Sequence, residues 1–267
     1  MVSKAQRESF LREGYLVVPD VVPPDLCRSV VDAILGFTGV RRDDPTTRYA
    51  GLGIVPLHHH QALWDVRQHP AVYEAFCDLY QDKALWVTMD RVGYKPPASD
   101  ATMDWQRAPV HWDCDAWTFR GLGLQGLVYL TDTTEDQGAF SCVPSIYKNL
   151  QTWLNAHADD EDRRHPDVDE DDIVPVAGSA GSLVVFHRLM PHTNGLNKSP
   201  RPRFAQYVAM NPVGDETERL ARIRQWRDKM PPEWALRQKV AGQQLPEPGE
   251  PARLSELGRR LVGLEPW

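Results

Sequence analysis

The chain has 267 residues, a formal net charge of -7, and 42% hydrophobic and 25% charged residues. This length suffices for one large domain with its own core. The acidic balance argues against a nucleic-acid partner, and the lack of an apolar run of about 18 residues argues against a membrane span. The start lacks the apolar stretch of a secretory signal, and the four cysteines show no close pair and no zinc spacing. We therefore expect a cytoplasmic protein with reduced thiols.

The first 84 residues are predicted to be mostly helical. A polar helix over 3–13 ends at Gly14, and a short apolar strand follows over 15–18. Prolines at 23 and 24 open a second helix with apolar residues at helical spacing, and 70–80 repeats that pattern. The stretch between them, 41–62, is predicted to be irregular.

From residue 85 the pattern changes to short apolar strands separated by polar turns. Because no crossover helices intervene, this pattern favours an antiparallel sandwich or barrel. The chain turns helical again after Pro212. We therefore expect one domain, 1–267, with a helical part (1–84), a β core (85–212) and a helical extension (213–267). The predicted strands span 85–94, 121–131, 139–143, 183–186 and 204–210, and the later helices span 216–229 and 255–264.

One segment, 158–172, is dense in charge and reads ADDEDRRHPDVDEDD. Such a run is usually a solvated loop, which is the prediction here. The alternative is a lid near the functional site.

A histidine and an aspartate stand two positions apart, at His111 and Asp113. Side chains on an extended strand alternate faces, so these two can reach one ion. Two histidines and one carboxylate form the facial triad of non-haem iron enzymes, so a third ligand is expected from a distant segment. His192 is the candidate, and His187 competes with it. Arg203 follows His192 by eleven positions, with Arg201 as its competitor.

At these positions the chain resembles the phytanoyl-CoA dioxygenase family. Order and spacing together make the resemblance specific over nearly the whole length. The sequence departs from the family at Asn194, where a small hydroxyl residue is common, at Trp112, where a glutamine is frequent, and over 144–147. The matching motifs are Phe10-x-x-x-Gly14-Tyr15-Leu16, Lys95-Pro96-Pro97, His111-x-Asp113, Tyr129-Leu130-Thr131-Asp132, Gly138-x-Phe140-x-x-x-Pro144, Phe186-His187, His192-x-x-Gly195-x-Asn197-x-Ser199 and Arg203.

The resemblance implies a double-stranded β-helix, the jelly-roll form, in a mainly β fold with flanking helices. It implies Fe(II) at His111, Asp113 and His192, with 2-oxoglutarate as cosubstrate and O2 as oxidant. The far carboxylate of the cosubstrate is expected on Arg203, with Lys95 as a second contact. The products are succinate, carbon dioxide and an oxidised substrate. Because the carboxylate of Asp113 is present, the resemblance favours hydroxylation, desaturation, epoxidation or cyclisation over halogenation.

Substrate contacts are harder to predict. Trp117 and Phe119 follow the first ligands and are candidates for the pocket wall, while Tyr129 and Gln206 lie on strands expected to face the interior. No basic cluster suggests an acyl-CoA, so we expect a small polar metabolite, either free or in a biosynthetic pathway. The run His58-His59-His60 is predicted to lie in a surface loop, with a substrate contact beside Arg48-Tyr49 as the alternative.

Two other functions fit the same residues. A jelly-roll binding module could keep the shape without catalysis, because fold does not imply activity. A zinc hydrolase could use the same three ligands and would need neither oxygen nor Arg203. Formation of succinate that depends on iron and oxygen separates the oxygenase from both.

Overall fold

Local sequence signals set the limits of the first helix. The Ser3 side chain accepts a hydrogen bond from the backbone N–H of Gln6, and the Gln6 side chain accepts one from the N–H of Ser3. This capping box starts the helix, and Gly14, with φ of 83°, ends it in the left-handed conformation that suits glycine. The computed structural model describes residues 1–42, 44, 53–99, 106 and 108–267. The helices are α1 (Lys4–Glu13), α2 (Pro24–Thr38), α3 (Gln61–Arg67), α4 (Pro70–Tyr80), α6 (Pro144–Lys148), α7 (Leu150–Ala156), η1 (Glu170–Asp172), α8 (Glu216–Arg227), α9 (Glu233–Gln238) and α10 (Glu256–Val262).

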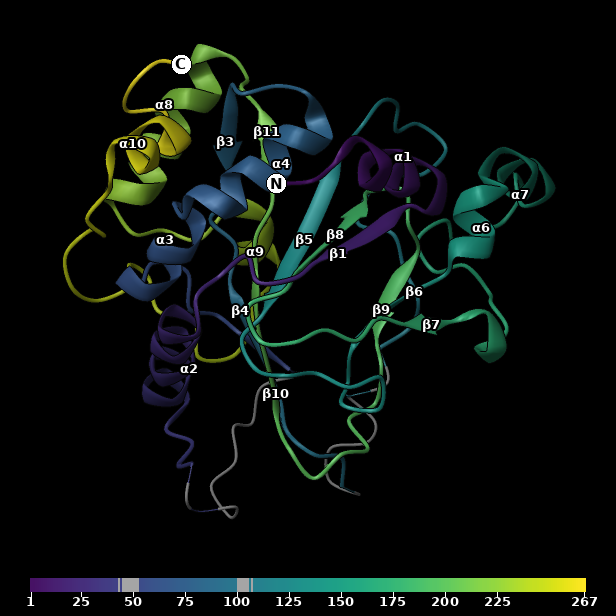
Figure 1. Cartoon of the computed structure of the whole chain (residues 1–267), viewed down its shortest axis with the longest axis horizontal. Helices are drawn as coiled ribbons and strands as arrows, with labels where there is room; N and C mark the ends of the chain where they lie inside the picture. Colours follow the sequence, from purple (N-terminus) through teal and green to yellow (C-terminus); the bar gives the residue numbers. More distant parts are fainter. Residues whose placement is uncertain (43, 45–52, 100–105, 107) are drawn as a thin grey trace.

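The described strands form three antiparallel sheets (Figure 1). The largest has six strands in the order β1-β8-β5-β10-β4-β2, and the others have the orders β7-β6-β9 and β11-β3. The strands are β1 (Tyr15–Val18), β2 (Ile54–Val55), β3 (Leu85–Val87), β4 (Val92–Lys95), β5 (Leu124–Tyr129), β6 (Phe140–Cys142), β7 (Val174–Pro175), β8 (Leu183–His187), β9 (His192–Asn194), β10 (Arg203–Tyr207) and β11 (Met210–Pro212).

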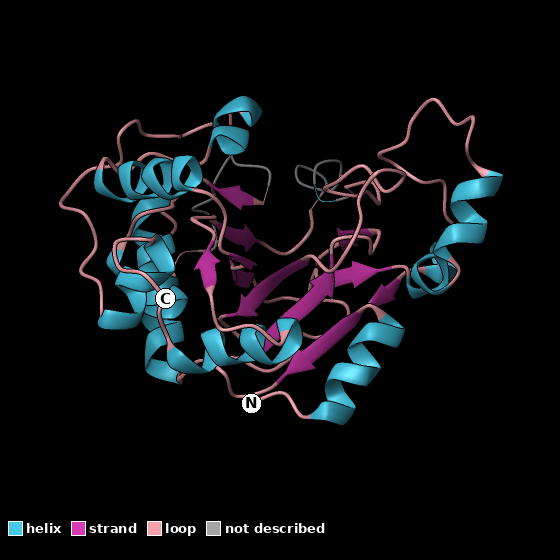
Figure 2. Ribbon diagram, turned by 90° about the horizontal axis from the view of Figure 1, so that it is seen from above, coloured by secondary structure: helices cyan, strands magenta, loops and turns pink. Residues whose placement is uncertain are grey.

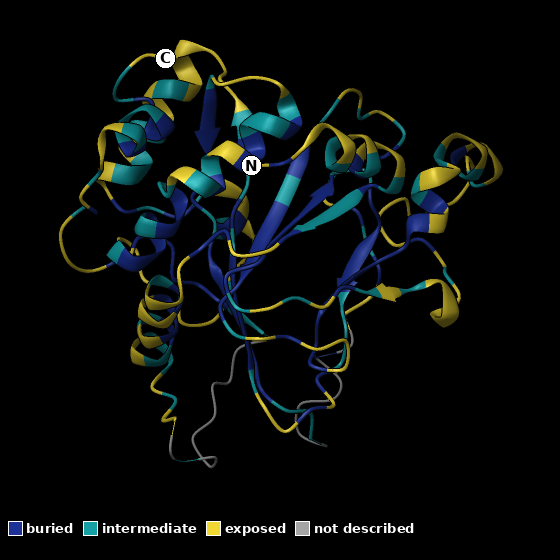
Figure 3. Cartoon of the chain, viewed as in Figure 1, coloured by how far each residue is buried: buried dark blue, intermediate teal, exposed yellow. Residues whose placement is uncertain are grey.

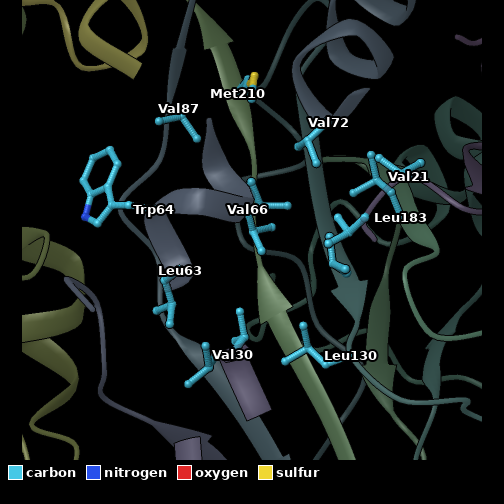
Figure 4. Packing of buried hydrophobic residues seen from close by; sticks show 14 of the residues in the cluster. Val21, Val30, Leu63, Trp64, Val66, Val72, Val87, Leu130, Leu183 and Met210 are labelled. Carbon is cyan, nitrogen blue, oxygen red and sulfur yellow. The ribbon is translucent and has the colours of Figure 1, made fainter. Parts of the chain in front are cut away.

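Alternate residues of the central strands belong to two different cores. Leu127 and Ala205 face the three-stranded sheet and join the cluster of Phe140. Their chain neighbours Val128 and Phe204 join the larger cluster that packs under the helices. Figure 4 shows part of this cluster, with Leu63 and Val66 of α3 near Leu130 and Leu183. This alternation is the period of two expected for a sheet covered on both faces. Most helices lie on one side of the strands, while α6 and α7 stand apart at the far edge (Figure 2).

The central strands are buried along most of their length (Figure 3). The predicted fold class, mainly β with flanking helices in a jelly-roll arrangement, is confirmed, although the described strands do not close into a barrel. The first 84 residues contribute β1 and β2 to the six-stranded sheet, so this part of the chain is built into the core. Among the described residues, no helix has the length and apolar character that a membrane crossing requires.

Two predicted strands are wrong in extent, and they break at the same level. The strand predicted over 85–94 is divided into β3 and β4, and the strand predicted over 204–210 into β10 and β11. The backbone N–H of Thr88 donates to the carbonyl of Ala209 at 2.8 Å, which keeps the two chains paired through the break. Both therefore pass together from the six-stranded sheet to the two-stranded sheet. The helices α3, α6, α7 and α9 were not predicted.

Candidate active site

The structure brings His111, Asp113 and His192 together. The backbones of His111 and His192 exchange two hydrogen bonds of 3.0 Å, which form an isolated bridge and place the two ring centroids 4.6 Å apart. The carboxylate oxygens of Asp113 lie 3.6 Å from Nε2 of His111 and 3.5 Å from Nε2 of His192. One ligand atom from each residue lies within 4.8 Å of the others, which is close enough to surround one ion.

This arrangement does not depend on the strand that the sequence predicts over 111–113. Only His111 is paired, and the chain bends from Asp113 onward. A bend turns Asp113 toward the two histidines, and the side chain of Gln125 holds it there by donating to Oδ2 at 2.9 Å. The sequence predicted that His111 and Asp113 lie close together, and they do, but a bend at Asp113 brings them together instead of alternation along a strand.

Both imidazoles present Nε2 to this centre because their other nitrogen is engaged. Nδ1 of His111 lies 3.1 Å from the carbonyl of Pro109, and Nδ1 of His192 lies 3.0 Å from that of Met190. A carbonyl oxygen only accepts, so the proton of each neutral ring sits on Nδ1 and the lone pair of Nε2 is free. Hydrogen bonds of this kind fix the tautomer of metal-binding histidines.

The charge states of His111 and Asp113 suit a divalent cation. Burial lowers the pKa of His111, and the neighbouring His192 lowers it further, so the ring is neutral at pH 7. Burial alone would raise the pKa of Asp113, but the adjacent imidazole of His192 and the hydrogen bond from Gln125 outweigh it and hold the pKa below its usual range. Two imidazole nitrogens and one carboxylate oxygen are the donor set of a non-haem iron centre.

His187 lies outside this cluster. Its Nδ1 accepts the backbone N–H of Leu189 at 3.0 Å, and its ring packs against Phe119 and Tyr147 with centroid distances of 6.2 Å and 5.4 Å. Burial lowers the pKa of His187 to about 4. Its surroundings are those of a packing residue, and the geometry favours His192 as the third ligand.

Arg203 and Lys95 are directly opposite each other on the paired strands β10 and β4. Their exposed fractions are 1% and 4%. Arg203 donates to Oδ1 of Asn194 at 2.5 Å and lies 5.9 Å from the ring centroid of Tyr129, while its Nε is buried without a partner. Lys95 donates to backbone carbonyls, and burial together with the charge of Arg203 lowers its pKa to about 7.

Two buried cations side by side require a counter-charge. No described carboxylate lies within ion-pairing distance of Arg203 or Lys95. Burying unpaired charge is costly, so the pair suits an anion that enters from outside. The orphaned Nε of Arg203 and the lowered pKa of Lys95 fit the far carboxylate of 2-oxoglutarate. Arg201, the competing arginine, is exposed and points to Gln137.

Tyr129 and Gln206, both predicted substrate contacts, lie on opposite faces of the sheet. The Tyr129 hydroxyl donates to the carbonyl of Val176 at 2.6 Å, and its ring supports Arg203. Gln206 donates to the carbonyl of Leu63 in α3 at 2.9 Å, on the helix-covered face. Since Gln206 is separated from Arg203 by three positions, alternation carries it away from the site.

Trp117 and Phe119 follow the first two ligands but have different surroundings. Trp117 packs in an aromatic cluster with Trp112 and Trp153, at centroid distances of 5.9 Å and 6.2 Å. Phe119 packs edge-on against His187. Both side chains are half-buried beside the site, and neither is among the three candidate ligands.

The charged segment 158–172 touches the site as well as solvent. The carbonyl of Arg164 accepts the backbone N–H of Trp112 at 3.0 Å, between the two ligands of the H-x-D motif. Its guanidinium lies 3.8 Å from the carboxylate of Asp113. Most charged side chains of the segment are exposed, as predicted, but its place is the one expected of the lid alternative.

The surface prediction for the three-histidine run is wrong for two of its members. His58 and His59 are buried, and their backbone N–H groups donate to the carboxylate of Glu247 at 2.7 Å and 2.9 Å. Only His60 is exposed. The covering residue lies almost 190 positions away, which no local pattern reveals. The predicted partners Arg48-Tyr49 lie outside the described residues.

Sequence reasoning missed three polar residues of the site. Gln125 holds Asp113, Asn194 holds Arg203, and the hydroxyl of Tyr207 lies over Gly93, where an added Cβ would be 3.1 Å from it and 3.3 Å from Nη1 of Arg203. Alternation from Arg203 could have found Tyr207, because residues 203 and 207 share a face. No pattern signalled Gln125, and Asn194 was marked only by its departure from the family motif, which did not reveal its contact with Arg203.

Comparisons with known proteins identify the family of the chain. The sequence model of the phytanoyl-CoA dioxygenase family matches residues 10–205. A Dictyostelium discoideum protein whose name places it in that family is 23% identical, over 77% of this chain and 74% of that protein.

Solved structures share the fold at low sequence identity. GIG2 from Candida albicans has a TM-score of 0.76 at 14% identity and covers 99% of this chain and 78% of its own. EvdO2 from Micromonospora carbonacea has a TM-score of 0.54 at 22% identity, covering 80% and 94%. SnoN, an α-ketoglutarate-dependent epimerase from nogalamycin biosynthesis, has a TM-score of 0.54 at 16% identity, covering 94% and 95%. With its family match, the chain belongs to the phytanoyl-CoA dioxygenase family of iron- and 2-oxoglutarate-dependent oxygenases.

Proposed function

We propose that this oxygenase hydroxylates an unactivated C–H bond of a small polar metabolite, with His111, Asp113 and His192 as the iron ligands. Arg203 and Lys95 bind the far carboxylate of 2-oxoglutarate. The observation that carries the proposal is the convergence of three ligand atoms within 4.8 Å of one another. The buried cation pair on the neighbouring sheet adds the second half of the site.

A ferrous ion at this centre would couple decarboxylation of 2-oxoglutarate to oxidation of a C–H bond, releasing succinate and carbon dioxide. The residues of the chain orient the metal ligands and neutralise the far carboxylate of 2-oxoglutarate. The carbonyls of Pro109 and Met190 keep the two Nε2 lone pairs directed inward, and Gln125 fixes the carboxylate of Asp113. Arg203 offers a planar guanidinium, which pairs with a carboxylate through two parallel hydrogen bonds.

The retained carboxylate of Asp113 supports an oxygen-derived outcome rather than halogenation, because it occupies the coordination position that a halide would need. One structural relative supports a role in a biosynthetic pathway, and another supports 2-oxoglutarate as the cosubstrate. SnoN is described as an epimerase of nogalamycin biosynthesis, and EvdO2 has been crystallised with 2-oxoglutarate. Hydroxylation is the outcome we propose, with a polar small molecule as substrate.

Replacing each of the two competing histidines by alanine tests the assignment of the third metal ligand. His192→Ala should lose Fe(II) binding and succinate formation, since it removes one of three ligands, whereas His187→Ala should keep Fe(II) binding. Metal titration and succinate assays under air measure both. The opposite pattern would reject the assignment. A wild-type protein that binds iron and 2-oxoglutarate but forms no succinate with any polar metabolite would favour the binding module.

Replacing Arg203 tests the cosubstrate assignment separately. Arg203→Ala should weaken 2-oxoglutarate binding by roughly 10- to 150-fold, the equivalent of about 1.5–3 kcal/mol for a charge-assisted contact. Metal affinity should stay unchanged, because Arg203 is not among the candidate ligands. Arg201→Ala, on the exposed neighbour two positions away, is the matched control. Equal 2-oxoglutarate affinity in both variants would contradict the assignment.

A further inference from the structure

Arg91 is another buried cation, and it lies on the same face of the sheet as the cation pair of Arg203 and Lys95. Arg91 precedes β4, and its carbonyl accepts the backbone N–H of Tyr207 at 3.1 Å, so pairing with β10 continues beyond the assigned strand. Residues 91, 93 and 95 alternate with the helix-facing ones, which puts Arg91 on the side of Lys95. Gly93 between them has no side chain, and the Tyr207 hydroxyl lies over it.

The strand register relates Arg91 to the metal centre. Tyr207 is opposite Leu127 on β5, and Leu127 shares a face with Gln125, two positions earlier. Gln125 donates to the ligand Asp113. One row of residues across the sheet therefore joins Arg91 to Tyr207 and Leu127, and the next row reaches the residue that supports the metal ligand. The row that contains Arg91 is therefore next to the row that supports the metal ligand, and Arg91 directly precedes the strand that carries Lys95.

The guanidinium of Arg91 is incompletely satisfied. Its exposed fraction is 6%, Nη2 donates to Oε1 of Gln238 at 2.6 Å, and Nη1 is buried without a partner. Arg67, which is also buried, differs because each of its terminal nitrogens donates to a backbone carbonyl, those of His58 and Asp90. No described carboxylate forms a close ion pair with the Arg91 guanidinium, although the carboxylate of the neighbouring Asp90 accepts the backbone N–H of Arg91 and lies close enough for the two charges to interact. A buried guanidinium with a free terminal N–H suits an incoming anion.

Helix α9 covers this position from the C-terminal extension. The indole of Trp234 lies 4.9 Å from the Arg91 guanidinium and is 37% exposed, so it stands between the charge and solvent. Gln238 belongs to the same helix. The family match ends at residue 205, so this wall is supplied by a part of the chain beyond it.

We propose that Arg91 binds a carboxylate of the substrate, in a subsite that α9 closes through Trp234 and Gln238. This inference rests on the proposed function and narrows its substrate to a carboxylate-bearing metabolite. The carboxylate pairs with Nη1 and Nη2 of Arg91, displacing the amide of Gln238. The indole of Trp234 moves aside when the acid enters.

Straight-chain carboxylates from butyrate to octanoate, each matched with its primary amide, test the subsite. Binding is measured by calorimetry with Zn(II) and saturating 2-oxoglutarate present, so that the probe cannot take the place of the cosubstrate at Arg203. The wild-type protein should bind a carboxylate at least about tenfold more tightly than its amide, because only the anion pairs with the guanidinium. Subtracting the tryptophan fluorescence of Trp234→Phe from that of the wild type isolates the emission of Trp234. This emission should change when the carboxylate is added and should not change when the amide is added.

Two variants make the test specific. Arg91→Gln should abolish the preference for carboxylate while leaving 2-oxoglutarate affinity unchanged. Arg91→Gln also removes the contacts that hold α9 to Arg91, so its effect could come from a displaced helix. Gln238→Glu tests the subsite without removing Arg91. It places a carboxylate of the chain beside the guanidinium, and should remove the preference while keeping or raising the melting temperature. Gln244→Glu adds the same charge at an exposed position and should bind carboxylates as the wild type does.

The outcomes separate the two proposals. Equal binding of acid and amide by the wild type, or a preference that survives in Arg91→Gln and Gln238→Glu, overturns the subsite and leaves the oxygenase assignment intact. Tighter binding of inorganic phosphate than of any carboxylate overturns the carboxylate assignment. A wild-type protein that fails to bind 2-oxoglutarate in the same titration refutes the proposed function itself.

Discussion

At the scale of single residues, the site depends on side chains that touch the candidate ligands without being ligands. Gln125 donates to Asp113 through Nε2, while its Oε1 is buried without a partner. Asn194 orients Arg203 in a similar way, by accepting a hydrogen bond from its guanidinium. Such supporting contacts orient ligands and commonly change metal affinity by 10- to 100-fold when lost.

Gln125→Leu should therefore weaken Fe(II) binding by roughly 10- to 100-fold, since the Asp113 carboxylate loses the donor that fixes its direction. Titration with Fe(II) under anaerobic conditions measures the change. Gln151→Leu, on the exposed side of α7, provides the control and should bind iron normally. Unchanged affinity in Gln125→Leu would show that Asp113 is oriented by other contacts.

At the scale of elements, the turn between β9 and β10 sets the position of Arg203. Asn197 is fully buried there, and its Nδ2 donates to the carbonyls of Lys95 and Arg201 at 3.1 Å and 2.8 Å. Its Oδ1 accepts from the backbone and hydroxyl of Ser199. One side chain thus ties the turn to the strand that carries the second cation.

Asn197→Ala should lower the free energy of unfolding by roughly 2–4 kcal/mol, because several buried polar groups lose their partner at once. It should also weaken 2-oxoglutarate binding, because the turn leads directly into Arg203. Denaturant unfolding and cosubstrate titration measure the two effects. Lys198→Ala changes the exposed neighbour and should alter neither. A stable Asn197→Ala with normal cosubstrate binding would contradict this role of the turn.

The elements themselves were largely predictable, and their long-range pairing was not. Helical spacing, Gly14 and the prolines at 23 and 24 gave α1 and α4 to within a residue and the start of α2, because these signals are local. The pair of His111 and Asp113 followed from spacing, whereas the bridge between His111 and His192 joins segments 81 positions apart and follows from tertiary packing. Residues that belong to no sequence motif, such as Gln125 and Arg91, could not be predicted from a local pattern, and only the structure shows their contacts.

At the scale of the whole molecule, the N-terminal part and the C-terminal extension meet around a buried polar group. Glu247 accepts from the backbones of His58 and His59. Burial lowers the pKa of His58 to about 3 and that of His59 to about 4. Both rings are therefore neutral in the folded protein at pH values where an unfolded histidine is already charged.

The free energy of unfolding should fall as the pH is lowered from about 6.5 to about 4, by up to about 1.4 kcal/mol per pH unit for each histidine. The unfolded chain takes up protons in this window and the folded one does not. Burial raises the pKa of Glu247, which works in the opposite direction near its own titration. His59→Gln should flatten the dependence measured by chemical unfolding, and the exposed His165→Gln should not. An equal slope in the two variants would exclude this origin.

The carboxylate of Glu247 has a further consequence for where the chain can be shortened. Cutting before residue 247 would remove the acceptor of two enclosed N–H groups in the N-terminal half, and would leave two uncharged imidazoles beside the gap. The part of the chain after residue 205, where the family match ends, therefore stabilises the N-terminal part through Glu247. A protein shortened before residue 247 would have a lower free energy of unfolding, although the cut is far from His58 and His59 in the sequence.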